Sequence, residues 1–194
     1  LQTFAALAVS SIAGYGFEIY HDKAKDTVMA ILMLAMMVPF VAVLVPLFQM
    51  FTKAKLINSW TGFILPSIAT PFLIMYFRNS ARSFPRDMLE AARIDGLNEF
   101  QIFIRMFIPM MKPTYASAAT ITFMGAWNAY LWPKVVMQTN EAITMPMLVA
   151  NTMGGYVIDY GVVMAAVTIC SLPTVIIFFC LQKSFTNAVA GAVK

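Results

Sequence analysis

The sequence predicts an all-α protein, a polytopic bundle of membrane-spanning helices. Of its 194 residues, 60% are hydrophobic and 11% are charged, whereas soluble domains average about 25% charged residues. Five apolar stretches are near or above the roughly 17–25 residues that a helix needs to cross a bilayer. These stretches span about 1–20, 27–51, 60–77, 113–133 and 156–181. They are continuous rather than alternating apolar and polar, which argues against a membrane β-barrel.

Several of the five predicted helices contain internal prolines. The second contains Pro39 and Pro46, the third Pro66 and Pro71, and the last Pro173. Each proline removes a backbone hydrogen bond and bends its helix, which a bundle tolerates when neighbouring groups satisfy the freed carbonyl. Such bends suit a protein that opens and closes, although proline is frequent in membrane helices generally.

Charge orients the predicted bundle. With five crossings, the connections 21–26, 78–112 and 182–194 share one side, and 52–59 and 134–155 share the other. Ten of the 13 basic residues lie on the first side: Lys23, Lys25, Arg78, Arg82, Arg86, Arg93, Arg105, Lys112, Lys183 and Lys194. The other three are Lys53, Lys55 and Lys134. The positive-inside rule makes the first side cytoplasmic, so the net charge of +4 indicates topology rather than nucleic-acid binding.

The usual constellations of catalysis and metal binding are missing from the sequence. It has no phosphate-binding Gly-rich loop and no nucleophile–base pair, and its single histidine, His21, lies in a short connection. The stretches 27–51, 60–77 and 113–133 contain no charged residue, whereas ion-coupled carriers usually place ionisable groups within the membrane. We therefore expect no catalytic residue, no metal site and no cofactor bound by this chain. Transport would take its energy from a partner.

One charged, alanine-rich segment, "PRDMLEAARIDG", interrupts the apolar sequence. Pro85 can occupy a first helical turn, and Asp87 and Glu90 lie near the positive end of the helix dipole. Arg93 lies near the negative end, and Gly96 can adopt the left-handed conformation that ends a helix. The segment therefore predicts a short, self-contained cytoplasmic helix.

A second helix is predicted directly after this glycine. Asn98 with Gln101 three residues later has the pattern of a capping box. Six apolar residues at helical spacing are expected to share one face: Phe100, Phe103, Ile104, Phe107, Ile108 and Met111. Pro109 and Pro113 then bend the chain into the next crossing, so the two helices form a knuckle at the membrane surface.

The first of these two short helices has a shallow side. Ala91 and Ala92 are small enough for this side to enter a groove of another protein, and Glu90 and Asp95 flank them with charge. The alternative is a solvated helix that lies on lipid headgroups. The residues alone favour neither interpretation.

The segment resembles the EAA loop of binding-protein-dependent ABC importer permeases. The pattern of that loop is Glu-Ala-Ala, three residues, Gly, nine residues, then Ile-x-Leu-Pro. Five residues match it in register: Glu90, Ala91, Ala92, Gly96 and Pro109. Met106 and Ile108 replace the Ile and the Leu. The resemblance narrows to the sugar-importing, maltose/lactose/arabinose type of permease through "MMVPFVAVLVPLFQMF", "WNAYLWP" and "LQKSFTNAVAGAVK".

This resemblance implies the type I ABC importer permease fold, with residues 1–194 as one transmembrane domain and its cytoplasmic loop at about 78–112. Family members have six helices, so we expect an N-terminal truncation, with the missing helix preceding Leu1. The implied location is the cytoplasmic membrane of a prokaryote. The implied partners are a second permease, two ATPases that use ATP and magnesium, and an extracellular or periplasmic solute-binding protein. The implied ATPase-coupling residues are Glu90, Ala91, Ala92, Asp95, Gly96 and Pro109.

Residues that contact sugar are less clearly indicated. Trp127, Asn128 and Tyr130 are expected near the external membrane surface, where rings could stack on sugars and an amide could bind hydroxyls. The alternative, which we favour, is an interfacial aromatic belt with a packing role. The loop "QTNEAITMPMLVANTMGGY" resembles the region that in maltose-type permeases reaches toward the binding protein. Its candidate contact residues are Thr144, Pro146, Gly154 and Gly155.

The leading hypothesis is therefore a permease subunit that moves a sugar or oligosaccharide by alternating access, with ATP hydrolysis on a separate subunit. One alternative is an ABC importer permease for another solute, such as glycerol phosphate or a polyamine. A secondary carrier or channel would leave the 89–109 pattern unexplained.

Overall fold

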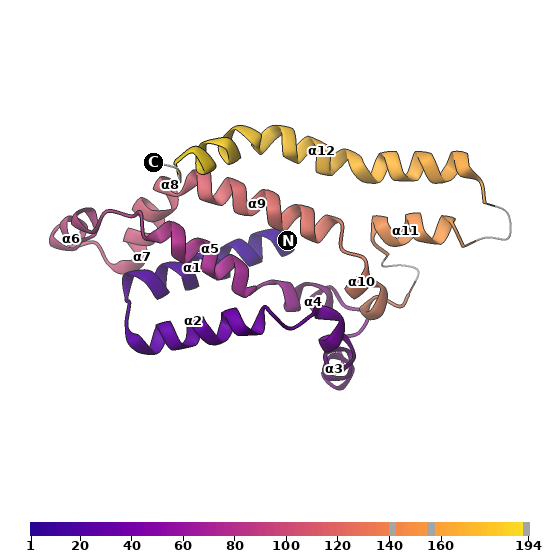
Figure 1. Ribbon diagram of the computed structural model, residues 1–194, viewed down its shortest axis with the longest axis horizontal. Helices are drawn as coiled ribbons and strands as arrows, with labels where there is room; N and C mark the ends of the chain where they lie inside the picture. Colours follow the sequence, from indigo (N-terminus) through magenta and orange to yellow (C-terminus); the bar gives the residue numbers. More distant parts are fainter. Residues whose placement is uncertain (140–142, 155–157, 192–194) are drawn as a thin grey trace.

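The computed structural model describes residues 1–139, 143–154 and 158–191. Throughout these residues the regular secondary structure is helical, which confirms the predicted all-α class (Figure 1). The elements are α1 (Gln2–Ile19), α2 (Lys23–Ala35), α3 (Phe40–Lys53), α4 (Trp60–Ile64), the 3₁₀ turn η1 (Leu65–Ser67), α5 (Pro71–Ala81), α6 (Arg86–Ile94), α7 (Glu99–Ile102), the π-helical segment η2 (Phe103–Phe107), α8 (Ile108–Met110), α9 (Lys112–Trp127), α10 (Leu131–Val136), α11 (Met145–Thr152) and α12 (Tyr160–Gly191).

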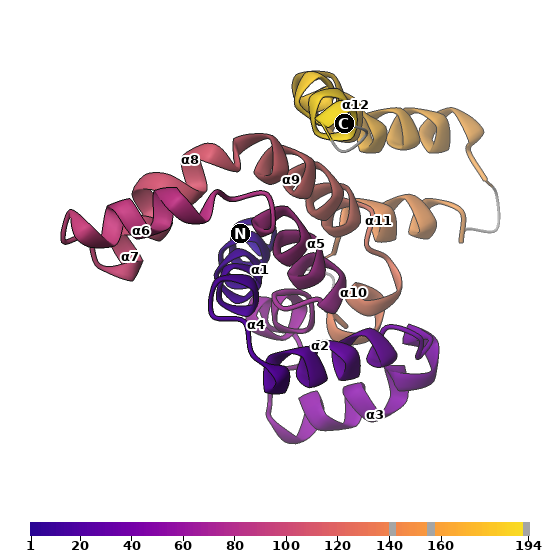
Figure 2. The same cartoon turned by 60° about the vertical axis from the view of Figure 1, so that its left-hand side comes forward.

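Three helices form the centre of the bundle. The helix α1 packs against both α5 and α9, and α12 runs along the other side of α9 (Figures 1 and 2). Buried apolar side chains from α1, α5 and α9 meet there, among them Leu7, Phe77 and Ala118. A separate cluster, which we call the end cluster, lies where α6, α7 and η2 join this bundle. It consists of Tyr15, Ala81, Phe84, Leu89, Ala92, Ile102, Phe103, Phe107 and Met111.

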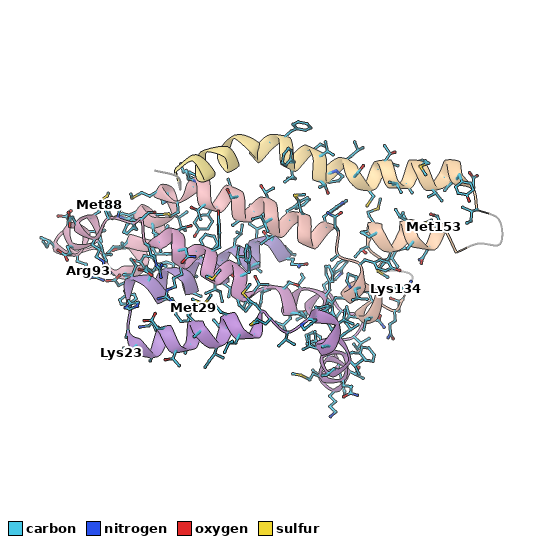
Figure 3. The ribbon with its side chains drawn as sticks, in the orientation of Figure 1. Lys23, Met29, Met88, Arg93, Lys134 and Met153 are labelled. Atoms are coloured by element: carbon cyan, nitrogen blue, oxygen red, sulfur yellow. The ribbon has the colours of Figure 1, made fainter. Side chains whose placement is uncertain are left out.

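Connections predicted to share a membrane side are found at the same end of the molecule. The turn from α1 to α2 and the α6–α8 segment lie at the left in Figure 1, whereas α3, α10 and α11 lie toward the right. Figure 3 shows Lys23 and Arg93 toward the first end and Lys134 toward the second. This arrangement agrees with the predicted order of crossings. The cytoplasmic assignment of the first end stays a prediction.

The membrane-crossing helices are less regular than predicted. Within the described residues, only Tyr160–Cys180 of α12 is long and apolar enough to cross alone, and two bent helix pairs raise the number to three if each is one span. The pair α2–α3 is bent by 102° and the pair α4–η1 with α5 by 48°. The expectation of one continuous helix is therefore wrong both for 27–51 and for 60–77. Because Pro39 lacks an N–H and disfavours a helical residue before it, α3 restarts after Pro39, its N-cap.

The helices α1 and α5 approach each other closely at Gly14. A Cβ atom at this position would lie 2.6 Å from the Cβ of Phe77, 2.7 Å from the backbone nitrogen of Arg78 and 2.9 Å from the carbonyl oxygen of Ile74. Two of these three atoms belong to the α5 backbone, which cannot rotate away as a side chain can. The contact therefore requires glycine.

Gly14→Ala should destabilise the purified protein by about 1–3 kcal/mol, because the added methyl group forces the two helices apart. The matched control is Gly16→Ala in the same helix, where no heavy atom lies within 4 Å of the added Cβ. Alanine there should stabilise the helix by about 0.5–1 kcal/mol. Melting temperatures of both variants in detergent measure the difference. Equal values would contradict a rigid α1–α5 contact.

Candidate functional site

The segment 85–96 folds as the sequence predicts. The helix α6 spans Arg86–Ile94, with Asp87 in its first turn and Arg93 in its last. These charges complement the helix dipole. Pro85 is the N-cap, with φ −64° and ψ 124°, so it lies one residue before the first turn rather than within it.

Gly96 ends α6 in the predicted left-handed conformation, with φ 79°. The Gly96 N–H donates to the Arg93 carbonyl at 3.1 Å, and the Leu97 N–H donates to the Ala92 carbonyl at 3.0 Å. This pair of hydrogen bonds is the Schellman motif, which satisfies carbonyls that a helix end leaves free. Leu97 then packs against the end cluster, so the turn fixes the direction of the following chain.

The capping box at the start of α7 is also confirmed. The Gln101 N–H donates to Asn98 Oδ1 at 2.9 Å, and the Asn98 N–H donates to Gln101 Oε1 at 2.9 Å. Each side chain thus satisfies a backbone donor that the helix cannot pair. Only four residues separate the end of α6 from α7, so the two helices form the predicted knuckle.

The buried face of the second helix differs from the prediction at two positions. Phe103, Phe107 and Met111 are buried as expected, but Phe100 is 68% exposed and Ile104 is 44% exposed. The sequence pattern assumed a regular α-helix, whereas Phe103–Phe107 is π-helical. Because a π-turn holds more residues than an α-turn, positions three apart, such as Ile104 and Phe107, no longer share the inner face. Ile102, which the pattern did not include, is fully buried.

The helix α6 has an inner and an outer face. Leu89 and Ala92 are buried in the end cluster, whereas Glu90 and Ala91 are exposed. Ile94 shares the outer face and is 85% exposed. The prediction that Ala91 and Ala92 together form an exposed shallow side is therefore wrong for Ala92. Ala92 lies three residues after Leu89 and so shares its side of the helix, which faces the end cluster.

Other residues assigned to this site lie next to α6 or beyond it. Asp95 is the exposed C-cap of α6. Pro109 is exposed in α8, after η2, so it belongs to the turn toward α9 rather than to the surface of α6. The assignment of these residues to ATPase coupling stays a prediction.

Arg78 of α5 joins three helices at the same end of the molecule. Its guanidinium lies 3.3 Å from Glu18 of α1 and 2.6 Å from Asp26 of α2. The Arg78 side chain is 7% exposed and that of Glu18 is 14% exposed, so this pair is largely removed from solvent. Arg82, one turn further along, also contacts Glu18, but its side chain is 59% exposed.

Glu99, the first residue of α7, joins α6 to α1. Its Oε1 accepts from Arg93 Nε at 2.8 Å, and its Oε2 accepts from the Tyr15 hydroxyl at 3.5 Å. Burial acts to raise the pKa of Glu99, but the hydroxyl of Tyr20 and the guanidinium of Arg93 outweigh it and lower the pKa below its ordinary value. Sequence analysis missed these contacts, although opposite charges recur at the ends of α1, α5 and α6.

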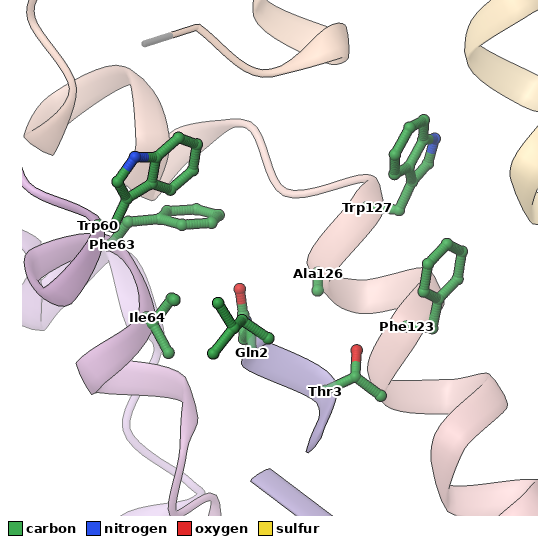
Figure 4. Close-up of a pocket in the computed structure, with 9 residues that line it drawn as sticks. Gln2, Thr3, Trp60, Phe63, Ile64, Phe123, Ala126 and Trp127 are labelled. Atoms are coloured by element: carbon green, nitrogen blue, oxygen red, sulfur yellow. The ribbon is translucent and has the colours of Figure 1, made fainter. Parts of the chain in front are cut away.

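The candidate translocation residues lie at the other end of α9. Trp127 donates its indole N–H to the Cys170 carbonyl at 2.8 Å and lines an apolar cavity of about 430 Å³. Figure 4 shows Trp60 and Phe63 on one side of this cavity and Phe123 and Trp127 on the other, with Gln2 between them. The bond from Trp127 to α12 supports a packing role, the interpretation that the sequence favoured.

Asn128 and Tyr130 are exposed, and Lys134 Nζ lies 5.4 Å from the centre of the Tyr130 ring. Asn128 lines a second cavity, of about 330 Å³, together with Pro146 from α11. The structure thus brings together two residues assigned to different candidate sites. Thr144 occupies the N-cap position of α11 without a side-chain capping bond, and its hydroxyl donates to the Ala129 carbonyl at 3.5 Å.

Gly154 follows α11 and is exposed, whereas Gly155 lies outside the described residues. In the described part of the chain no three His, Cys, Asp or Glu side chains are grouped so that they could hold a metal ion. The end of the molecule that carries α6 is the best-defined candidate site, and it presents a structured contact surface in which the charged Glu90 lies beside exposed apolar side chains such as Ile94.

Comparison with known proteins matches residues 6–191 to the family described as "Binding-protein-dependent transport system inner membrane component". The lactose transport system permease protein LacG of Rhizobium radiobacter is 42% identical over 99% of this chain and 70% of that protein. The arabinooligosaccharides transport system permease protein AraQ of Bacillus subtilis is 35% identical over 99% and 69%. A bacterial ABC transporter that imports the polysaccharide alginate shares the fold, with a TM-score of 0.80 at 23% identity over 95% of this chain and 73% of its own.

Proposed function

This chain belongs to the family of inner membrane components of binding-protein-dependent transport systems, and from that premise we propose that it carries a sugar or oligosaccharide across the cytoplasmic membrane by alternating access. ATP and magnesium are used by partner ATPase subunits, and this chain binds neither. A second permease subunit completes the path, and a solute-binding protein delivers the sugar from outside.

The observation that carries this proposal is the construction of α6. Its inner face is anchored by Leu89 and Ala92 in the end cluster, its end is fixed by the left-handed Gly96, and its outer face presents Glu90, Ala91 and Ile94. A helix held on one side and free on the other is suited to transmit force between two proteins.

Movement of α6 reaches the bundle through the end cluster in the proposed mechanism. This cluster contains Tyr15 of α1 and Phe107 of η2, whose rings contact each other at 4.9 Å between centroids. When ATP binding draws the ATPases together, α6 moves with its ATPase and displaces the attached ends of α1 and α9. The opposite end of the bundle then opens to accept sugar from the binding protein.

A sugar is the preferred substrate class because of the relatives. The names of LacG and AraQ refer to transport of lactose and of arabinooligosaccharides. Aromatic rings around the cavity beside Trp127 suit the apolar faces of sugars, although this cavity offers few polar groups. The choice of a sugar as the substrate class therefore depends on the relatives, whereas the coupling role depends on the structure of α6.

The test is uptake by the complete transporter in proteoliposomes, assembled from the full-length permease with its partner permease and ATPases. Lactose, arabinooligosaccharides and glycerol 3-phosphate are each supplied on the purified binding protein. We expect uptake of one of the two sugars, only when ATP and magnesium are enclosed with the ATPases. Glycerol 3-phosphate uptake would support the alternative solute class, and uptake driven by an ion gradient without ATP would contradict the proposal.

A further inference from the structure

The contact between α6 and α1 has an apolar part and a polar part. The apolar part is the end cluster, in which Tyr15 lies edge-on to Phe103 and Phe107 at 5.2 and 4.9 Å between ring centroids. The polar part is Glu99, whose two carboxylate oxygens accept from Arg93 of α6 and from Tyr15 of α1. Tyr15 takes part in both, through its ring and its hydroxyl.

These two parts have different physical consequences. Apolar burial depends mainly on the area removed from water, so the end cluster provides most of the attraction that holds α6 against the bundle. Hydrogen bonds, in contrast, depend on distance and angle. The two contacts of Glu99 therefore add a directional restraint on how α6 lies against α1.

We propose that Glu99 is a positioning residue for energy coupling: by binding Arg93 and Tyr15 together, it makes α6 and α1 move as one unit when the ATPases close. This inference rests on the proposed function and deepens it. Glu99 does not belong to the outer face of α6, because its carboxylate is directed to α1 and to Arg93.

The position of α1 explains why this connection matters. The same helix is held against α5 at Gly14, where its backbone is too close for any side chain, and it also packs against α9. A displacement of α1 is therefore passed to both central partners. Without Glu99, only the apolar contacts of the end cluster would pass a movement of α6 on to α1.

The test compares Glu99→Ala and Tyr15→Phe in the complete transporter. Tyr15→Phe keeps the ring in the end cluster and removes only the hydroxyl that donates to Glu99. The measured quantity is the factor by which sugar-loaded binding protein stimulates ATP hydrolysis. The sugar is lactose, or an arabinooligosaccharide if the uptake test selects that sugar. Retained ATPase subunits and the melting temperature are measured in parallel.

We expect Glu99→Ala to lower this stimulation at least about fivefold with ATPases retained and an unchanged melting temperature. Tyr15→Phe should lower it in the same direction, and the double variant should be no worse than Glu99→Ala, because both remove one connection. The control is Asp22→Asn, which removes an exposed carboxylate at the same end of the molecule. Asparagine can still cap α2 as Asp22 does, so this variant should behave as wild type.

Unchanged stimulation in Glu99→Ala, or additive losses in the double variant, would overturn the inference. Loss of the ATPase subunits from Glu99→Ala would also overturn it, because Glu99 would then belong to the docking surface. Failure of the proposed function itself is distinguishable, since wild type would then show no ATP-dependent uptake before any variant is made.

Discussion

Gly96→Val should leave the subunit in the membrane but abolish ATP-driven uptake. The position has φ 79°, a conformation that costs a β-branched residue about 1–3 kcal/mol. No heavy atom lies within 4 Å of an added Cβ, so the cost is backbone strain rather than collision. To relieve it, the chain must give up the hydrogen bonds from Gly96 and Leu97 that end α6, which tilts the outer face of α6.

Gly96→Asn is the matched control, because asparagine tolerates the left-handed conformation better than other side chains. It should retain most uptake. Glu90→Lys provides a second test, since it reverses one charge on the outer face without changing the backbone. Uptake, ATP hydrolysis and retention of the ATPases are measured for each variant. Normal uptake by both Gly96→Val and Glu90→Lys would refute the coupling role of α6 and favour a helix that lies on the headgroups.

Arg78→Met should strongly destabilise the protein. It leaves the largely buried Glu18 carboxylate without its buried partner and also removes the bond to Asp26. Removing one member of a buried ion pair typically costs about 3–5 kcal/mol, because the remaining charge stays desolvated. The junction of α1, α2 and α5 should therefore loosen.

Arg82→Met is the control for Arg78→Met. Both arginines contact Glu18, but the exposed Arg82 should contribute only about 0–1 kcal/mol. Melting temperature in detergent and yield of folded protein distinguish the two variants. A melting temperature of Arg78→Met equal to that of Arg82→Met would show that Glu18 does not depend on its buried partner.

Prediction from the sequence was most accurate where the local structure depends on residues that are close together in the chain. The Gly96 turn and the Asn98 capping box each involve residues at most five positions apart, so local pattern was sufficient. The same reasoning located α6 to within two residues at each end. It failed for Ala92, which lies beside exposed Ala91 but faces the end cluster, because burial there depends on side chains from α1 and η2.

Contacts between residues that are far apart in the sequence could not be predicted from local patterns. Arg78 pairs with Glu18 and Asp26, which lie 60 and 52 positions away. Nothing in the local sequence selects these partners among the acidic residues at the same end. The π-turn at Phe103–Phe107 was missed for a similar reason, since the hydrophobic pattern was interpreted with the α-helical period. Pro39 was recognised as a bend, but not as the end of one helix and the start of another.

The helix α6 has nine residues, fewer than the roughly 12–15 at which an isolated helix becomes even marginally stable in water. Its local hydrogen bonds can form quickly, but the helix persists only once Leu89 and Ala92 are packed into the end cluster. A newly made chain whose first helix has not yet met η2 therefore presents no lasting α6. Under the proposed function, the ATPases would therefore dock only on subunits in which α1 and η2 have already come together.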